Sequence, residues 1–196
     1  MKEVLISTRP KWIEKEANGE KTIEVRKTRP KSGTPFKCYI YCTNTRRDFF
    51  FNIETVNGKK GEYAIPHTGN GKVIGEFVCD RIYEWTYNYN VGEYNIGEDS
   101  LCRTCLSYSE FENYGKGKTL YGWHISNLVI YDKPKELSEF YLQCEEYGKT
   151  GTIDTPKKCK KCRYQYTWNL ASKCIIDGLK PITRPPQSWC YVEEGE

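Results

Sequence analysis

The residues with the clearest chemical potential lie close together near the N-terminus, in the stretch Gly19-Glu20-Lys21-Thr22-Ile23-Glu24-Val25-Arg26. A lysine amine can act as a base or stabilise an oxyanion, and a neighbouring carboxylate can move the proton. Lysine and arginine can instead bind phosphate, while a carboxylate accepts a hydrogen bond from an exocyclic amine. The stretch therefore suits either cleavage of an amide or phosphodiester, or binding of a nucleotide-like ligand.

A short helix and a strand are expected to position these groups. Pro10 is typical of the first turn of a helix and Gly19 of the residue just after a helix end, so we expect a helix between them and an extended segment afterwards. Side chains alternate along a strand, and simple parity puts Lys21 and Glu24 on opposite faces. A turn or bulge after Gly19 would bring them together. The alternative is an edge strand whose charges only face water.

The run Gly19-x-Lys21-x-x-Glu24-x-Arg26, preceded by a short helix, resembles the ASCH domain, a relative of the PUA-like β-barrels. The resemblance implies binding of RNA or another nucleic acid. Some small members act as amidohydrolases on an N4-acylated cytidine, with the motif lysine in the site, and others are proposed ribonucleases. Those amidohydrolases carry threonine where this chain has Glu24. The likeness covers roughly residues 1–43, 72–82 and 119–131 and the last strand.

The fold that this resemblance implies is α+β: a small mixed β-barrel of the PUA-like ASCH type, with a few short helices and a Cys-rich insertion before the last strand. We divide the chain into an ASCH-like barrel (1–142), a Cys-rich zinc-binding insertion (143–180) and a final barrel strand with its tail (181–196). At 196 residues the chain is long enough for one well-buried core.

The favoured function is binding of RNA or of a modified nucleoside or nucleotide in a cleft beside the motif. Lys21 and Arg26 would hold phosphate or a base carbonyl, and Glu24 would accept from an exocyclic amine. A tryptophan would cover the base. The ligand-binding residues that we expect are Arg9, Trp12, Lys21, Glu24, Arg26, Ser188 and Trp189.

Two other functions remain open. In a hydrolase, Lys21 would be the base or oxyanion stabiliser, and Glu24 or Glu76 would manage the proton. Burial would have to lower the pKa of such a lysine, whereas a lysine paired with Glu24 stays charged. In a protein-interaction or regulatory module, the Cys-rich segment would be the contact surface.

The ten cysteines point to a metal site. The N-terminus is charged and no stretch approaches the roughly 20 apolar residues of a membrane span, so we expect a cytoplasmic protein with reduced thiols and no membrane partner. Cys159-x-x-Cys162 has zinc-ligand spacing. We expect Cys144 and Cys174 to complete a structural zinc site. The alternative pairs Cys159 and Cys162 with Cys102 and Cys105.

The composition favours an aromatic-rich β structure, with 16 Tyr, 7 Phe and 5 Trp against one Met. The formal charge of +4 permits a polyanionic partner without requiring one. The basic loop 27–35 is either a phosphate-facing rim or a solvated loop, and the Tyr-rich stretch 84–95 either lines a groove for stacked bases or packs over the barrel. We expect strands at 2–7, 36–43, 72–80, 120–131 and 189–192, a hairpin-like excursion at 44–71, helices starting after the caps Thr8 and Ser109, and a helical turn at 134–140.

Overall fold

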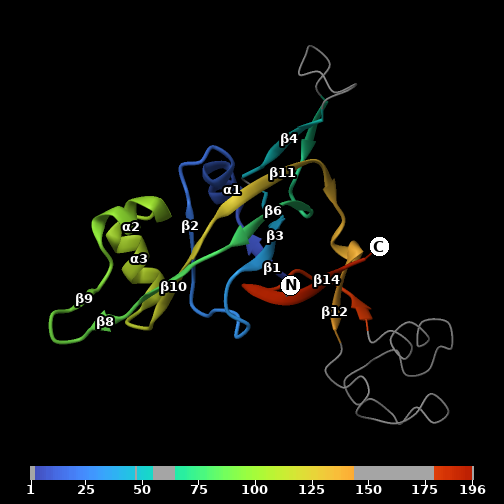
Figure 1. Cartoon of the computed structure of the whole chain (residues 1–196). Helices are drawn as coiled ribbons and strands as arrows, with labels where there is room; N and C mark the ends of the chain where they lie inside the picture. The colour runs from blue at the N-terminus through green and yellow to red at the C-terminus, as the bar shows by residue number, and fades with distance from the viewer. Residues whose placement is uncertain (1–2, 47, 55–64, 144–178, 196) are drawn as a thin grey trace, which may run out of the picture.

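The computed structural model describes residues 3–46, 48–54, 65–143 and 179–195. Its main sheet has seven strands in the order β11-β6-β3-β1-β14-β12-β13 (Figure 1). The described ranges contain no helix long and apolar enough to cross a membrane. The strands of the main sheet are β1 (Glu3–Thr8), β3 (Phe36–Cys42), β6 (Val73–Cys79), β11 (Ser126–Lys135), β12 (Phe140–Gln143), β13 (Leu179–Pro181) and β14 (Trp189–Glu194).

A second sheet of three strands, β2-β10-β7, lies between the main sheet and two helices (Figure 1). Only Ile125 separates β10 from β11, so one segment of chain runs from the second sheet into the first. The remaining elements are β2 (Ile23–Arg26), β7 (Ile82–Trp85), β10 (Leu120–His124), the ribbons β4 (Phe51–Glu54) with β5 (Ile65–Thr68) and β8 (Tyr87–Asn88) with β9 (Glu93–Tyr94), the helices α1 (Pro10–Ala17), α2 (Glu98–Thr104) and α3 (Tyr108–Gly115), and the 3-10 turn η2 (Leu137–Glu139).

Strand β1 is the centre of the main sheet. It pairs in parallel with β3 and antiparallel with β14, and α1 lies on the crossover between the parallel strands. Val4, Leu5 and Ile6 are completely buried because both faces of the strand are covered, which explains the uninterrupted apolar run. Val4 and Ile6 face one core cluster and Leu5 a second.

The N-terminal helix begins and ends where the sequence predicts, but the residue that precedes it is not the predicted cap. Helix α1 starts at Pro10 and ends at Ala17, and Gly19 follows with a φ of +76°. The prediction that Thr8 caps the helix is wrong. The residue preceding the helix is Arg9, which makes no side-chain cap, because β1 continues through Thr8.

Helix α3 also starts at a different cap from the one predicted. Ser107, not Ser109, precedes the helix, and its hydroxyl accepts from the Glu110 amide at 3.2 Å. The Glu110 carboxylate accepts in turn from the Ser107 amide at 2.9 Å. This reciprocal pair is a capping box, which satisfies two groups at the helix start and so outcompetes a cap at Ser109.

The Tyr-rich stretch forms β7 and the β8–β9 ribbon, which the sequence pattern did not reveal, and α2 was not predicted either. Trp85 and Tyr94 are buried with Phe111 in a third core cluster. In contrast, Tyr89 is 78% exposed. Packing therefore accounts for part of this stretch, and part of it faces solvent.

The helical turn predicted from Pro134 is also displaced. Strand β11 continues through Lys135, and the single turn η2 follows before β12 begins at Phe140. The pairing of β11 with β6 is irregular between Ile130 and Lys135. A proline is tolerated at such an irregularity, where its missing N–H breaks no ladder bond.

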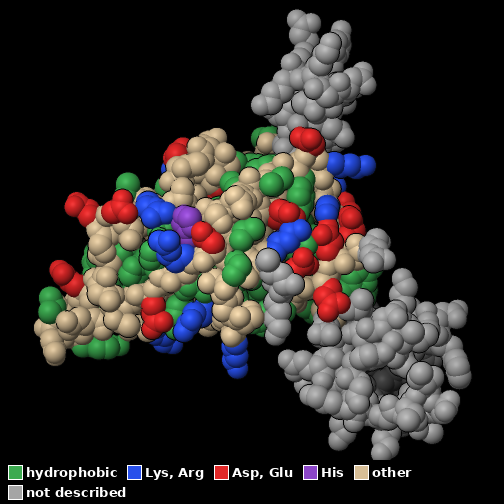
Figure 2. Space-filling model, in the orientation of Figure 1, with side chains coloured by type: hydrophobic (Ala, Val, Ile, Leu, Met, Phe, Trp, Pro, Cys, Tyr) green, Lys and Arg blue, Asp and Glu red, His purple; other side chains and the backbone are tan. Residues whose placement is uncertain are grey.

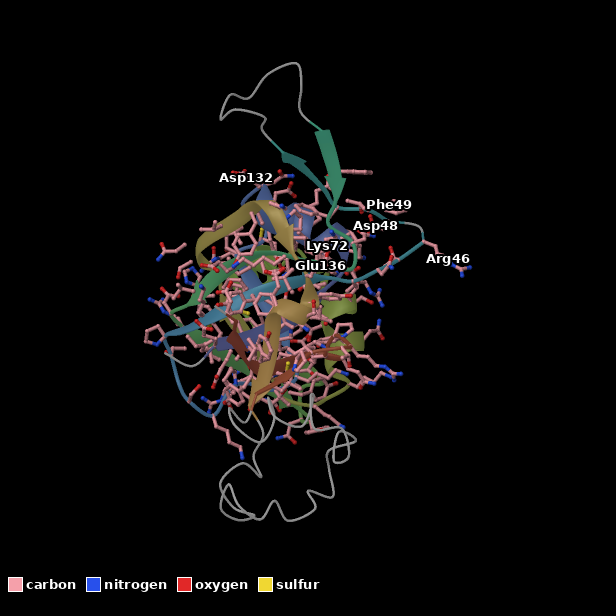
Figure 3. The ribbon with its side chains drawn as sticks, turned by 90° about the vertical axis from the view of Figure 1, so that its right-hand side faces the viewer. Arg46, Asp48, Phe49, Lys72, Asp132 and Glu136 are labelled. Carbon is pink, nitrogen blue, oxygen red and sulfur yellow. The ribbon has the colours of Figure 1, made fainter. Side chains whose placement is uncertain are left out.

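The excursion at 44–71 contains the antiparallel β4–β5 ribbon, whose tip, 55–64, lies outside the described residues. Of the three consecutive phenylalanines, only Phe50 is buried, while Phe49 and Phe51 are exposed. At the base of the ribbon the Asp48 carboxylate accepts from the Lys11 amide at 2.9 Å. Figure 3 labels Asp48 and Phe49 near the base of the ribbon.

The packing of β10 against β7 gives a test of the second sheet. A Cβ at Gly122 would overlap the Trp85 ring and lie 2.8 Å from Ile23 Cγ2. We predict that Gly122→Ala lowers the free energy of unfolding in urea by about 1–3 kcal/mol, because the buried ring must move. Gly97→Ser is the control, since a Cβ there meets nothing within 4 Å. Equal stability of the two variants would contradict this packing.

Candidate functional site

A turn, rather than a continuous strand, brings the motif lysine to the motif glutamate. Lys21 lies before β2, and its amide donates to the Lys15 carbonyl at the end of α1 at 3.0 Å. The left-handed Gly19 allows this reversal. The Lys21 ammonium forms an ion pair with the Glu24 carboxylate. Of the two arrangements considered, the turn after Gly19 is therefore the correct one.

A third residue, Glu16, also contacts Lys21, and the sequence did not predict it as a site residue. Its Oε1 lies 2.6 Å from Lys21 Nζ, and the Glu16 side chain is completely buried. Glu16 lies on α1 one turn after Ile13, on the helix face that packs inward. A carboxylate at an apolar position of a short helix was the signal that could have identified it. We call Glu16, Lys21, Glu24 and Arg26 the buried cluster.

Arg26 ties the buried cluster to the main sheet. Its Nη2 lies 2.7 Å from Glu24 Oε1 and donates to the Ser7 carbonyl at 3.0 Å. It also donates to Thr8 Oγ1 at 3.3 Å, and Nη1 donates to the Ser188 carbonyl at 3.1 Å. One guanidinium thus joins β2 to the end of β1 and to the residue before β14. The predicted site residues Lys21, Glu24, Arg26 and Ser188 do lie together.

The buried cluster contains both fixed and adjustable charges. Burial lowers the pKa of Lys21, but the Glu16 and Glu24 carboxylates outweigh burial and leave this pKa above its ordinary value. Burial raises the pKa of Glu24, but Lys21 and Arg26 outweigh it, so the pKa ends below its ordinary value. For Glu16, burial prevails over Lys21 and raises the pKa to about 7. Glu16 is therefore the member that can exchange a proton near neutral pH.

Two polar atoms of the buried cluster have no hydrogen-bond partner among the described residues. They are Glu16 Oε2 and Arg26 Nε. A buried polar atom without a partner costs roughly 1–3 kcal/mol, and more when the group is charged. Native folds rarely retain such atoms, which makes the buried cluster a candidate site.

The two predicted tryptophans differ in their relation to the buried cluster. Trp189 directly follows Ser188 and donates from Nε1 to Thr28 Oγ1 at 2.9 Å. Trp12 lies on α1, half-buried, with Lys11 Nζ 4.2 Å from its ring centroid. Arg9 is exposed at the start of that helix.

Glu76 lies apart from the motif. In the pairing of β3 with β6 it is opposite Tyr39, which faces the second core cluster, whereas Cys38 faces the first. Glu76 forms an ion pair with Lys37 at 2.9 Å and accepts a hydrogen bond from the Tyr131 hydroxyl. Because Glu24 lies opposite Trp123, a residue of the first core cluster, the main sheet separates Glu76 from Lys21.

His124 has a partner that is distant in sequence. Its Nδ1, at the end of β10, lies 2.6 Å from Oδ1 of Asp80, which lies in the turn between β6 and β7. The hydrogen bond from His124 holds the pKa of Asp80 below its ordinary value. The histidine is partly exposed, and 44 residues separate it from the aspartate in the sequence.

The cysteines in the described ranges are free thiols. Cys38 and Cys42 on β3 are buried, while Cys102 is exposed and Cys105 half-buried. No group of three or more potential metal ligands occurs among the described residues. The predicted zinc ligands Cys144, Cys159, Cys162 and Cys174 lie outside them.

The strand order, the helical crossover after β1 and the buried cluster define a small mixed α+β protein with a barrel-like arrangement of sheets. This is the fold of ASCH from Zymomonas mobilis, whose crystal structure has a TM-score of 0.51 at 15% identity over 97% of this chain and 87% of that one. Structures of two of its point mutants give TM-scores of 0.52 at 15% identity, covering 98% and 97% of this chain and 91% and 88% of theirs. No protein-family model matches the sequence, and neither does any curated protein. The chain thus has the ASCH fold.

The raised pKa of Glu16 predicts a pH-dependent stability. Below its ordinary pKa of 4.5, Glu16 is protonated in both the folded and the unfolded chain. Between 4.5 and about 7 the unfolded chain loses this proton while the folded chain keeps it, so rising pH favours unfolding. Glu16→Gln abolishes this contribution. We expect the loss of stability between pH 5 and pH 7.5 to be roughly 2 kcal/mol smaller in this variant than in the wild type.

Urea unfolding of wild type and Glu16→Gln at the two pH values measures this effect. Glu14→Gln is the matched control, because Glu14 is exposed on the same helix. If Glu16→Gln follows the wild-type pH dependence, the folded-state pKa of Glu16 is not raised.

Proposed function

We propose that this protein binds single-stranded RNA or a modified nucleotide through an exposed surface beside the buried cluster. The surface consists of the loop after β2 and the aromatic rings that support it. We call it the basic aromatic surface, and its members are Lys27, Arg29, Lys31, Tyr114, Tyr121, Trp189 and Tyr191.

The observation that carries the proposal is the pairing of cations of this loop with aromatic rings of α3 and β10. Lys27 Nζ lies 4.8 Å from the centroid of the Tyr114 ring, and the Arg29 guanidinium carbon lies 5.4 Å from that of Tyr121. Both cations are exposed. Proteins that bind single strands combine cations along the backbone with rings on which bases stack, and each stacked base contributes about 1–3 kcal/mol.

Hydrogen bonds hold the loop against the last strand. The Lys31 amide donates to the Tyr191 hydroxyl at 2.9 Å, and the Trp189 indole donates to Thr28 Oγ1. The rings of Trp189 and Tyr191 lie edge to face at 5.4 Å. A preorganised loop loses less conformational entropy on binding than a free one, which favours affinity.

The buried cluster is proposed to form the floor of this surface. Lys21, Glu24 and Arg26 are only 4–7% exposed and point toward one another. Arg26 directly precedes Lys27, so the cluster fixes where the basic loop begins. The prediction that cluster residues and Ser188 touch the ligand stays a prediction. The raised pKa of Lys21 supports a charged, binding lysine over a lysine base.

The modest net charge suits recognition by a local surface rather than by the whole molecule. On the face in Figure 2, positive and negative side chains are interspersed. Arg29 itself lies 3.9 Å from the exposed Glu84, a separation at which a surface ion pair contributes little. Arg29 can therefore exchange Glu84 for a phosphate at small cost.

Hydrolysis of the bound nucleotide is the second candidate function, and one observation favours it. Glu16 is buried beside Lys21, its Oε2 has no partner among the described residues, and its pKa of about 7 suits a general acid or base. In this mechanism Glu16 would transfer the proton, and the charged Lys21 would stabilise the developing oxyanion.

The Cys-rich insertion is proposed to bind one structural zinc ion through Cys144, Cys159, Cys162 and Cys174. Thiolate ligands require reduced cysteines, and we propose a cytoplasmic location on the same grounds. The free thiols of the described part of the chain fit a reducing compartment. A protein partner at this insertion is the remaining alternative function.

RNA binding can be tested with a short unstructured RNA in a fluorescence anisotropy titration. We predict that Lys27→Ala and Arg29→Ala each weaken binding about three- to tenfold. Each should also reduce the slope of log affinity against log salt by about 0.7, because each removes one phosphate contact on a single strand. Lys133→Ala, on β11, removes an equal charge from another exposed position and is the control.

If the wild type does not bind RNA at low salt, the proposal is overturned and the protein-interaction alternative remains. If the wild type lowers the mass of the bound RNA and Glu16→Gln does not, the function is hydrolysis. Equal losses in Lys133→Ala and Lys27→Ala would show that binding depends on total charge only.

The zinc site can be tested by native mass spectrometry. We predict one zinc ion per chain, retained in Cys102→Ser but lost in Cys159→Ser and in Cys174→Ser, because a four-thiolate site needs all its ligands. Retention of zinc by Cys174→Ser together with its loss from Cys102→Ser would assign the ion to the two Cys-x-x-Cys pairs instead.

A further inference from the structure

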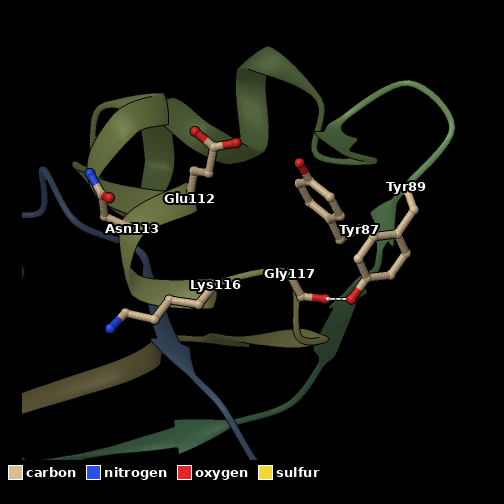
Figure 4. A pocket seen from close by; sticks show the side chains of 6 residues that line it. All are labelled: Tyr87, Tyr89, Glu112, Asn113, Lys116 and Gly117. Carbon is tan, nitrogen blue, oxygen red and sulfur yellow. Dashed lines mark hydrogen bonds between the residues drawn. The ribbon is translucent and has the colours of Figure 1, made fainter.

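A hollow of about 440 Å³ lies between α3 and the β8–β9 ribbon (Figure 4). Its size is within the range of small-ligand sites. We propose that this hollow binds a guanine base. The inference deepens the proposed function, on which it rests for the identity of the ligand as part of an RNA strand. The lining residues are Tyr87, Tyr89, Glu112, Asn113, Lys116 and Gly117.

The two tyrosine rings are held in place although one of them is largely exposed. The Tyr89 hydroxyl donates to the Gly117 carbonyl at 3.0 Å, which fixes the far end of the ring (Figure 4). Tyr87 contacts the Tyr89 ring at 5.1 Å and the buried Tyr94 ring at the same centroid separation. Exposed aromatic side chains that the fold orients in this way are suited to stacking on a planar ligand.

The loop between α3 and β10 leaves the hollow open. Lys116 and Gly117 both have positive φ, of 53° and 74°, so the chain turns sharply after the helix. A Cβ at Gly117 would lie 3.2 Å from the Tyr89 hydroxyl oxygen, and only glycine permits this approach without displacing the ring. The wall of the hollow is therefore backbone, with a carbonyl that the Tyr89 hydroxyl already occupies.

The charged residues of the hollow have no ion-pair partner in the described part of the chain. Glu112 and Lys116 have the i, i+4 spacing at which a helix normally pairs opposite charges. Their side chains instead diverge: in Figure 4 the Glu112 carboxylate is turned toward the Tyr87 ring, whereas the Lys116 side chain runs away from the two tyrosine rings. Asn113 donates to the Ser109 hydroxyl at 3.3 Å and keeps its amide oxygen available. A carboxylate and an ammonium are thus both available to a ligand.

Guanine matches this arrangement better than the other bases. Its Watson–Crick edge presents a ring N–H beside an exocyclic amine, and a carboxylate can accept both hydrogen bonds with its two oxygens. Adenine and cytosine present one amine beside an acceptor nitrogen, which would repel the Glu112 carboxylate. Uracil presents a single N–H between two carbonyls. Lys116 would then hold the phosphate of the same nucleotide.

The hollow adjoins the basic aromatic surface through α3. Tyr114, the ring beneath Lys27, directly follows Asn113, which lines the hollow. One helix thus supports both the cation–ring pairs of the proposed RNA path and the proposed base site.

Isothermal titration with GMP, AMP, CMP and UMP tests the base site separately from RNA binding. We expect GMP to bind at least tenfold more tightly than the other three. Glu112→Gln should weaken GMP binding by 10- to 100-fold, because one carboxylate oxygen becomes an N–H donor that opposes the guanine amine. Tyr89→Ser should weaken the binding of every nucleotide that stacks on the Tyr89 ring. Glu93→Gln, on the exposed side of β9, is the control and should leave GMP binding unchanged.

The same variants are then titrated with two short RNAs that differ in one guanine-to-adenine change. Glu112→Gln should abolish the preference for the guanine-containing RNA while leaving its binding to the adenine-containing RNA unchanged. Equal affinity for the four nucleotides, or an unchanged guanine preference in Glu112→Gln, would overturn the base site while RNA binding stands. Tight GMP binding without RNA binding would retain the hollow as a nucleotide site and overturn the RNA function instead.

Discussion

The ammonium of Lys21, held between the carboxylates of Glu16 and Glu24, is the contact on which the site depends. It joins a helix, a glycine turn and a strand. Taking such charges out of water is costly, and the mutual attraction offsets the cost only when every partner is present. Removal of one partner from a buried pair typically destabilises a fold by 3–5 kcal/mol. The cluster therefore constrains α1 and β2 to a single relative position.

Arg26 extends this constraint from the second sheet to the first. Its contacts with the Ser7 and Ser188 carbonyls join strand ends that are distant in the sequence. The basic loop starts at the next residue, so the buried ionic network fixes its first position, and the hydrogen bonds to Tyr191 and Trp189 hold the residues that follow. This arrangement places exposed cations on a rigid support, as preorganised binding requires. Burial within the same cluster raises the pKa of Glu16 against the opposing charge of Lys21, so the support and the proton-exchanging group are one structure.

The sequence predicted the elements whose signals are local. Pro10 and Gly19 delimited α1, alternation identified β3, and the motif spacing placed Lys21 with Glu24 once a turn was allowed. Those signals follow from backbone preferences that act within a few residues.

Contacts between distant segments could not be predicted in the same way. Asp80 and His124 meet because β6 and β10 end near each other, and Glu76 is separated from Lys21 by the pairing register of β6 with β3. A shift of one residue in that register would have turned Glu76 to the other face, and no local pattern fixes the register of a strand with both faces covered. Glu16 was missed for a related reason: its carboxylate is stabilised by a lysine beyond the helix end, and helix propensity alone places a glutamate on the solvent side. Sequence patterns therefore mislead at sites built from buried charges. The hydrophobic pattern places charged side chains in water, whereas here the fold buries them beside partners of opposite charge.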